Sequence, residues 1–123
     1  MTSKKPFILS TGSDPMLLNS RKLVLEHAGF QVESCQADEA VDRLRADAEA
    51  FDGALLGQSI GLERRIEIAH EMRQLAAELA IILVYFPEDR FDASVCDAIV
   101  ETPSEPEAMA RAVWRALKKR GRA

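Results

Sequence analysis

The chain has 123 residues, a formal net charge of −4 and a hydrophobic content of 47%. This length fits one domain, and this hydrophobic content supplies a core and excludes a disordered chain. The acidic balance gives no sign of a nucleic-acid binder that works through bulk positive charge.

A strand followed by a helix opens the chain. Residues 7–9 are an apolar run that predicts a strand buried on both faces. Asp14 predicts an N-cap, Pro15 suits the first helical position, and Gly29 ends the helix. Arg21 lies close to the apolar stripe of this helix, so we interpret it as a side chain that reaches out to water. The stripe itself is expected at Leu17, Val24, Leu25 and Ala28.

The same alternation continues along the chain. Residues 30–36, 51–56, 80–86 and 97–101 predict four more strands, and 80–86 is the most apolar and therefore central. Stripes of apolar residues predict helices over 37–48 and from Leu62 to about Leu79. Residues 89–96 fit either a short helix or a turn. Ser104 and Glu107 form a capping-box pattern, which predicts the start of a last helix.

The inward residues of the later helices follow from the same spacing. In the second helix they are Ala37, Ala40, Val41, Leu44 and Ala48; in the third, Ile66, Ala69, Met72, Leu75 and Ala76; in the last, Met109, Val113 and Leu117. Five strands that alternate with helices imply an α/β domain, here 1–123, with a parallel sheet covered on both faces. In such a sheet the default site is the edge where the strands' carboxyl ends meet, and this edge holds loops 12–14, 57–61, 85–89 and 102–103.

Four segments resemble the receiver domains of bacterial two-component signalling. They are FILSTGSDPMLL, FDGALLG, AIILVYF and CDAIVETPSEPEAMARAV, and together with the spacing between them they extend the resemblance over nearly the whole chain. The resemblance implies a single-domain (βα)5 flavodoxin-like three-layer sandwich, with a five-stranded parallel sheet of order 2-1-3-4-5. The stretch between Tyr85 and Thr102 is shorter than in typical receivers, which implies a fourth helix that is short or missing.

The resemblance fails at the positions that carry the family's chemistry. Receivers use two acids for Mg²⁺, an aspartate that accepts the phosphoryl group, a hydroxyl residue and a lysine. The corresponding positions here are Gly12, Ser13, Gly57, Tyr85 and Thr102. Asp14 alone remains in the first loop, where we expect it to be an N-cap, and one carboxylate does not replace a three-carboxylate metal site. We therefore expect no phosphotransfer, no metal, no cofactor and no catalysis.

The expected function is a phosphorylation-independent pseudo-receiver, a protein-interaction module in signal transduction. Its partner would be a kinase, a regulator or a second copy of the chain, with no nucleic acid and no membrane involved. The expected partner face includes Trp114, Phe91 and Arg111. The alternative is a small-ligand domain that binds a nucleotide, flavin or phosphate at the loop edge. Polar residues interrupt the N-terminal apolar run, so no targeting segment is expected and the location is expected to be cytoplasmic.

Several residues allow both a functional and a structural interpretation. Gly57 fits a turn that needs a positive φ or a close backbone approach. Tyr85 fits either a switch or a filler of space, and Trp114 fits either an exposed anchor or a partial core residue. His27 and His70 are expected to face solvent, and with the two cysteines, Cys35 and Cys96, far apart no metal-ligand spacing exists. The C-terminal cations Lys118, Lys119, Arg120 and Arg122 are expected to be a solvated helix end.

Overall fold

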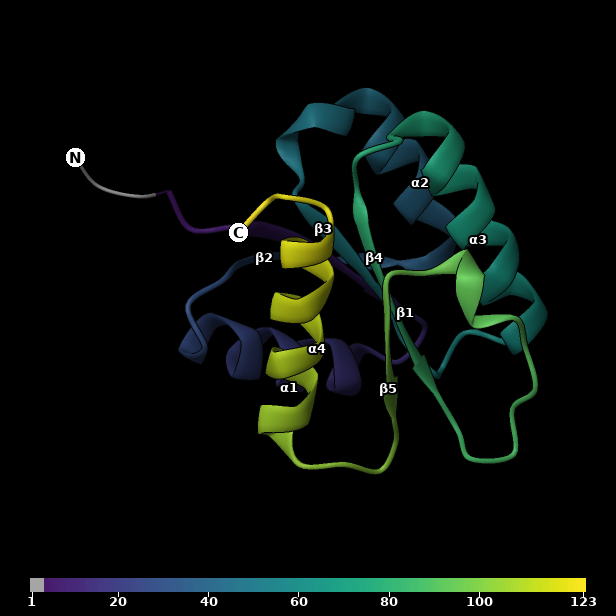
Figure 1. Ribbon diagram of the computed structural model, residues 1–123. Coiled ribbons are helices and arrows are strands. Elements are labelled where there is room, and N and C mark those ends of the chain that lie inside the picture. The colour runs from purple at the N-terminus through teal and green to yellow at the C-terminus, as the bar shows by residue number, and fades with distance from the viewer. Residues whose placement is uncertain (1–3) are drawn as a thin grey trace.

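A five-stranded parallel sheet forms the centre of the molecule (Figure 1). The computed structural model describes residues 4–123. The strand order β2-β1-β3-β4-β5 confirms the predicted order. The strands are β1 (Phe7–Gly12), β2 (Gln31–Gln36), β3 (Gly53–Leu56), β4 (Ala80–Tyr85) and β5 (Ala98–Glu101).

Helices cover both faces of the sheet, which gives three layers (Figure 1). One face packs against α1 (Pro15–His27) and α4 (Pro106–Lys119), and the other packs against α2 (Ala37–Ala46) and α3 (Leu62–Leu75). Two short 3-10 turns complete the elements, η1 (Ala48–Ala50) and η2 (Ala93–Val95). No helix within residues 4–123 has the length and apolar character needed to cross a membrane.

Strand β4 shows why the core has two halves. Successive side chains of a strand point to opposite faces. Ile81 and Leu83 therefore pack in the cluster under α2 and α3, whereas Ile82 and Val84 pack in the cluster under α1 and α4. All four side chains are fully buried, as a central parallel strand requires.

The predicted start and end of α1 are confirmed. The carboxylate of Asp14 accepts a hydrogen bond from the Met16 amide at 2.9 Å, and Pro15 is the first helical residue. Gly29 follows the helix with a φ of 103°, a conformation that glycine adopts without steric cost.

Two predicted helix ends are wrong. Helix α3 ends at Leu75 rather than near Leu79, because the chain from Ala76 turns so that Leu79 enters the core from outside the helix. Helix α4 begins at Pro106, and its N-cap is Glu105, whose side chain makes no capping hydrogen bond. Ser104 therefore lies one residue too early for the predicted capping box.

Part of the predicted helix interior is also wrong. Arg65 and Ile68 are buried in α3, whereas Ile66 is only half-buried. In α1 the buried residues are Leu18, Arg21 and Leu25. Arg21 does not reach water: it lies on the inward stripe itself, three residues after Leu18 and four before Leu25, where α1 packs against the sheet.

The segment between β4 and β5 contains only η2, which confirms that the fourth helix of a typical receiver is missing or very short. Asp92 caps this turn by accepting a hydrogen bond from the Ser94 amide at 3.0 Å. His27 and His70 are exposed, as predicted.

Candidate functional site at the loop edge

The carboxyl ends of β1, β3, β4 and β5 bring the predicted site positions to one edge of the sheet. The parallel registers align Thr11 with Leu56, Leu56 with Leu83, and Tyr85 with Glu101. Gly57 follows β3 directly, and Thr102 follows β5 directly. The arrangement therefore matches the edge that the sequence predicts as the site.

Two loops are tied together on the β1–β3 side of this edge. The Gly57 amide donates to the Thr11 carbonyl at 2.9 Å, which continues the ladder past the end of β3. The Ser13 amide donates to Ser59 Oγ, also at 2.9 Å. These contacts fix Gly12, Ser13 and Gly57 relative to one another.

Arg21 extends from α1 to Gly57. A Cβ atom built on Gly57 would overlap Arg21 Nη1 and would lie 2.9 Å from the Thr11 carbonyl oxygen. Arg21 Nη2 donates to the side-chain carbonyl of Gln58. The guanidinium therefore fills the space over Gly57 into which a side chain at position 57 would project.

Close approach, and not backbone conformation, explains the glycine at position 57. Among the described residues only Gly29 and Gly121 have a positive φ, so Gly57 lies in a region open to other residues. What excludes a side chain there is the Arg21 guanidinium and the Thr11 carbonyl. Of the two reasons that the sequence offers for this glycine, the close approach is therefore the one found.

The residues at this edge do not fit the divalent cation of a receiver. Gly12, Ser13 and Gly57 supply no carboxylate, and Asp14 already caps α1. A buried guanidinium beside Gly57 also places a positive charge where a Mg²⁺ ion would need negative oxygens. No group of three or more acidic, histidine or cysteine side chains within residues 4–123 could hold a metal ion.

Tyr85 and Thr102 lie on the β4–β5 side of the edge. The Thr102 amide donates to the Tyr85 carbonyl at 2.8 Å, and the Thr102–Pro103 peptide bond is cis. The ring of Tyr85 packs edge-on against Phe91, with 5.6 Å between ring centroids. Tyr85 is half-buried and packs against the α2–α3 half of the core.

Arg65 joins β4 to the β3–α3 loop, a contact that is not among the predictions from the sequence. The side chain is 2% exposed. Its guanidinium donates to the carbonyls of Ile60 and Val84 and pairs with Asp89 at 3.2 Å. All three nitrogens of the Arg65 guanidinium therefore have an acceptor, whereas Nη1 of Arg21 has none among the described residues.

Gly57→Ala is expected to lower the free energy of unfolding by about 1–3 kcal/mol, because a methyl group must displace Arg21 and the Thr11 carbonyl. In an Arg21→Met background the same change is expected to cost at least about 0.5 kcal/mol less, since one of the two obstacles is gone. Urea unfolding of the four proteins measures this coupling.

Gly61→Ala is the matched control for this cycle. Gly61 lies in the same loop, and nothing lies within 4 Å of a Cβ built on it. Its substitution is expected to change stability little in either background. Equal costs of Gly57→Ala with and without Arg21 would show that the guanidinium does not occupy this space.

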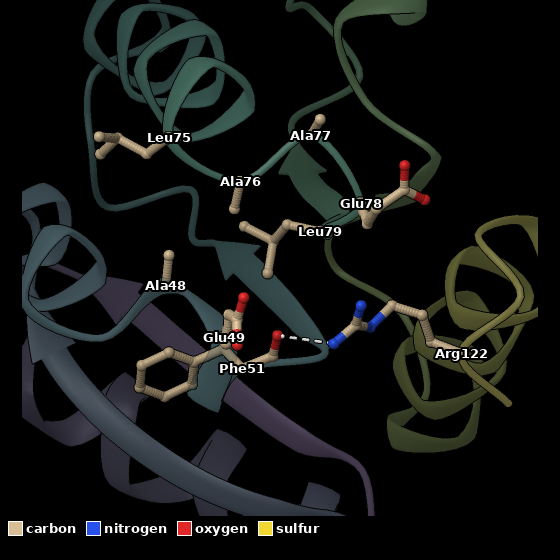
Figure 2. A pocket seen from close by; sticks show the side chains of 9 residues that line it. All are labelled: Ala48, Glu49, Phe51, Leu75, Ala76, Ala77, Glu78, Leu79 and Arg122. Carbon is tan, nitrogen blue, oxygen red and sulfur yellow. Dashed lines mark hydrogen bonds between the residues drawn. The ribbon is translucent and has the colours of Figure 1, made fainter.

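The opposite edge of the sheet carries a hollow of about 500 Å³ (Figure 2). Phe51, Leu75 and Leu79 line it together with Glu49 and Glu78. Figure 2 shows Arg122 at one side of the hollow, where its guanidinium donates to the Phe51 carbonyl at 3.2 Å. The hollow contains none of the predicted site residues.

Three of the four C-terminal cations form ion pairs, which corrects the prediction of a solvated helix end; the weakest of these pairs joins Lys119 to Asp97 at 3.8 Å. Arg120 donates to Asp97 at 2.8 Å, and Arg122 pairs with Asp52 at 3.0 Å. Arg73 joins Arg120 on Asp97, whose carboxylate also accepts the Ile81 amide at 2.8 Å. The amino edge of the sheet is therefore held by ion pairs, while the loop edge carries Arg21.

The two cysteines are buried, free thiols on different elements. Burial raises the pKa of Cys35 to about 11, with Glu39 and Glu33 adding to the effect. Burial also raises the pKa of Cys96 to about 11, with Asp97 as the next cause. Both thiols therefore stay protonated at neutral pH and are poor nucleophiles.

The three residues predicted for a partner face lie in different surroundings. The Trp114 ring packs on Phe30, with 4.5 Å between centroids, against the α1–α4 half of the core. Phe91 packs against the other half of the core, with Tyr85. Arg111 is exposed and lines a groove of about 260 Å³ between α4 and β5, together with Arg115.

Comparison with known proteins identifies the architecture. No family model and no curated protein matches the sequence. Among solved structures, a response regulator receiver domain protein from Clostridium thermocellum superposes with a TM-score of 0.84 at 16% identity, over 94% of this chain and 97% of that one. A CheY-like receiver domain protein from Methanospirillum hungatei gives 0.79 at 23% identity, over 96% and 98%.

A third match comes from the complex of the histidine kinase ThkA with the response regulator protein TrrA. Its TM-score is 0.76 at 18% identity, with 91% of this chain and 98% of that chain covered. These identities are low, but each superposition covers more than 90% of both chains. The chain has the fold of the response-regulator receiver domains.

Proposed function

We propose that the chain is a pseudo-receiver, a signalling module that binds a protein partner without being phosphorylated and without catalysis of its own. One observation carries this proposal. At the phosphoacceptor position stands Gly57, and the guanidinium of Arg21 occupies the space beside it. In this proposal the receiver fold is kept, but position 57 has no side chain that could be phosphorylated.

The groove between α4 and β5 is the surface we propose for the partner. Arg111 and Arg115 line it and are exposed, and neither makes an ion pair with a described residue. Glu101 is the one acid in the lining. The local excess of positive charge on a chain of net charge −4 favours a protein partner that presents an acidic segment.

Fewer classes of small ligand fit the loop edge than the sequence alone allows. Arg21 and Gln58 fill the space over Gly57, so a planar flavin or nucleobase ring has little room there. The positive charge of Arg21 favours a small anion among the ligands considered.

Incubation with acetyl phosphate and Mg²⁺ is expected to leave the intact mass of the protein unchanged, because the acceptor and both metal-binding acids are absent. Gly57→Asp is expected to stay unphosphorylated as well, since positions 12 and 13 still lack acids. Mass spectrometry gives the result, with a phosphorylatable receiver as positive control. Addition of one phosphoryl group to this chain would overturn the proposal.

Acetyl phosphate treatment also tests whether partner binding is independent of phosphorylation. Partner capture from an extract of the source cell, on the immobilised chain, is expected to be equal with and without acetyl phosphate. Arg111→Glu is expected to reduce capture, and Lys118→Glu is the matched control, a charge reversal on the same helix outside the groove. Capture that depends on acetyl phosphate, or that Lys118→Glu reduces equally, would contradict the proposal.

A further inference from the structure

Two arginines are buried among the described residues, Arg21 and Arg65, and only one of them has an acid for a partner. Arg65 pairs with Asp89 and binds two carbonyls. Arg21 is 6% exposed and has no carboxylate oxygen within 4 Å among residues 4–123. Its one acceptor is the neutral carbonyl of Gln58, and its Nη1 has no hydrogen-bond partner in the described part of the chain.

A buried cation without an anion is unfavourable, because desolvation is not repaid by a nearby opposite charge. Burial lowers the pKa of the Arg21 guanidinium, and Asp14 opposes this at longer range. Asp14 is itself engaged as the N-cap of α1. The positive charge of Arg21 at the loop edge is therefore only partly balanced by the negative charge of Asp14.

A second unpartnered polar group lies on the same side of the sheet. Ser10 follows Ile8 by two residues in β1, so both side chains face the α1–α4 layer. Ser10 Oγ is fully buried and has no partner among the described residues. Polar groups buried in native proteins normally have partners, so each of these two unpartnered atoms is unusual.

The loops beside Gly57 carry two hydroxyl groups. The hydroxyls of Ser13 and Ser59 lie in the two loops that meet there, joined by the Ser13 amide on Ser59 Oγ. Gln58 is bonded to the guanidinium and is half-buried in a surface loop. An oxyanion in place of the Gln58 carbonyl would give Arg21 the negative partner that it lacks, in a fork geometry that guanidinium groups favour.

We propose that the loop edge reversibly binds a small tetrahedral oxyanion, a phosphate group, through Arg21, with Gln58 as the neutral acceptor that the anion displaces. No covalent bond forms or breaks. Phosphate would be an effector of the proposed interaction module. Its binding does not depend on which protein is the partner. The phosphate is either free or part of a phosphate monoester.

Thermal unfolding in inorganic phosphate, compared with chloride at equal ionic strength, tests the proposal. The melting temperature is expected to rise saturably with phosphate, by about 5 °C at ten times the dissociation constant. Arg21→Met is expected to abolish the shift. Lys22→Met removes the neighbouring positive charge on the same helix and is expected to leave the shift intact. Methyl phosphate in a parallel series distinguishes a monoester from the free anion.

Two measurements keep the test decisive if Arg21→Met folds poorly. In the unchanged protein, the Arg21 Nε–H resonance is expected to move during a phosphate titration. Gln58→Ala is expected to bind phosphate at least as tightly, because a competing acceptor is removed. No phosphate-specific shift, or equal losses in Arg21→Met and Lys22→Met, would overturn the proposal. Reversible binding leaves the mass unchanged, so this result is separate from the phosphorylation test.

Discussion

Arg65→Met is expected to lower the free energy of unfolding by about 3–5 kcal/mol, the cost typical of removing one member of a buried ion pair. The guanidinium is 2% exposed, and its loss leaves the Asp89 carboxylate without its cation. It also leaves the carbonyls of Ile60 and Val84 without their side-chain donor. Methionine fills much of the volume, so the effect measures mainly the lost polar contacts.

Arg64→Met is the matched control for this experiment. Arg64 precedes Arg65 on α3, and its guanidinium binds Glu67 and Glu71 at the surface. Exposed ion pairs contribute little, so a change below about 1 kcal/mol is expected. Urea unfolding at neutral pH measures both variants. A loss for Arg65→Met as small as the control's would show that Arg65 does not hold the β4 edge together.

Asp97→Asn is expected to lower the free energy of unfolding by about 3 kcal/mol at neutral pH. The Asp97 side chain is 1% exposed and carries the negative charge for Arg73 and Arg120. An amide keeps the shape but turns a donor towards those guanidinium groups and removes the charge. Asp42→Asn is the control, because Asp42 is exposed and, among residues 4–123, pairs only with Arg45 at the surface.

The pH dependence of stability gives a second readout for Asp97. Burial alone would raise the pKa of this carboxyl, but the Ile81 amide and the arginines Arg73 and Arg120 outweigh it, so its pKa lies below the ordinary value. A lowered pKa in the folded state adds stability above the unfolded-state pKa of about 3.9. That stability is lost as the pH falls through the folded-state pKa.

The wild-type protein is therefore expected to lose more stability than Asp97→Asn when the pH falls below about 4. Denaturant unfolding over a pH series shows this as a difference between the two curves that narrows towards acid. A constant difference at every pH would mean that Asp97 acts through its shape and not through its charge.

The fold could be predicted because its signals are local and repeated. Apolar runs such as 80–86, the Asp14–Pro15 start and Gly29 each report on their own element, and their alternation leads to a parallel sheet. The errors lie at helix ends. Ser104 and Glu107 have the right spacing for a capping box, yet the helix starts at Pro106, one residue later than this box predicts. Pattern alone does not decide between two adjacent start signals.

The sequence predicts that the candidate positions lie at one edge of the sheet, but it does not predict which side chain fills that edge. Gly12, Ser13, Gly57, Tyr85 and Thr102 lie at one edge, as expected. What fills that edge was missed, because arginine in a helix normally extends to solvent. The available signal was the register of Arg21 with Leu18 and Leu25, which marks an inward position whatever residue stands there. Arg65 shares this register with Ile68, Ala69 and Met72.

Asp52 joins the two ends of the described chain. Its carboxylate accepts the Phe7 amide at 2.8 Å at the start of β1 and pairs with Arg122 beyond α4. A tag or a tether attached after Arg122 would therefore leave the molecule from the amino edge, about 17 Å from Gly57, the length of the five residue steps from Asp52 along β3. A chain anchored in this way presents its arginine-filled edge and both loops around it to whatever is in solution.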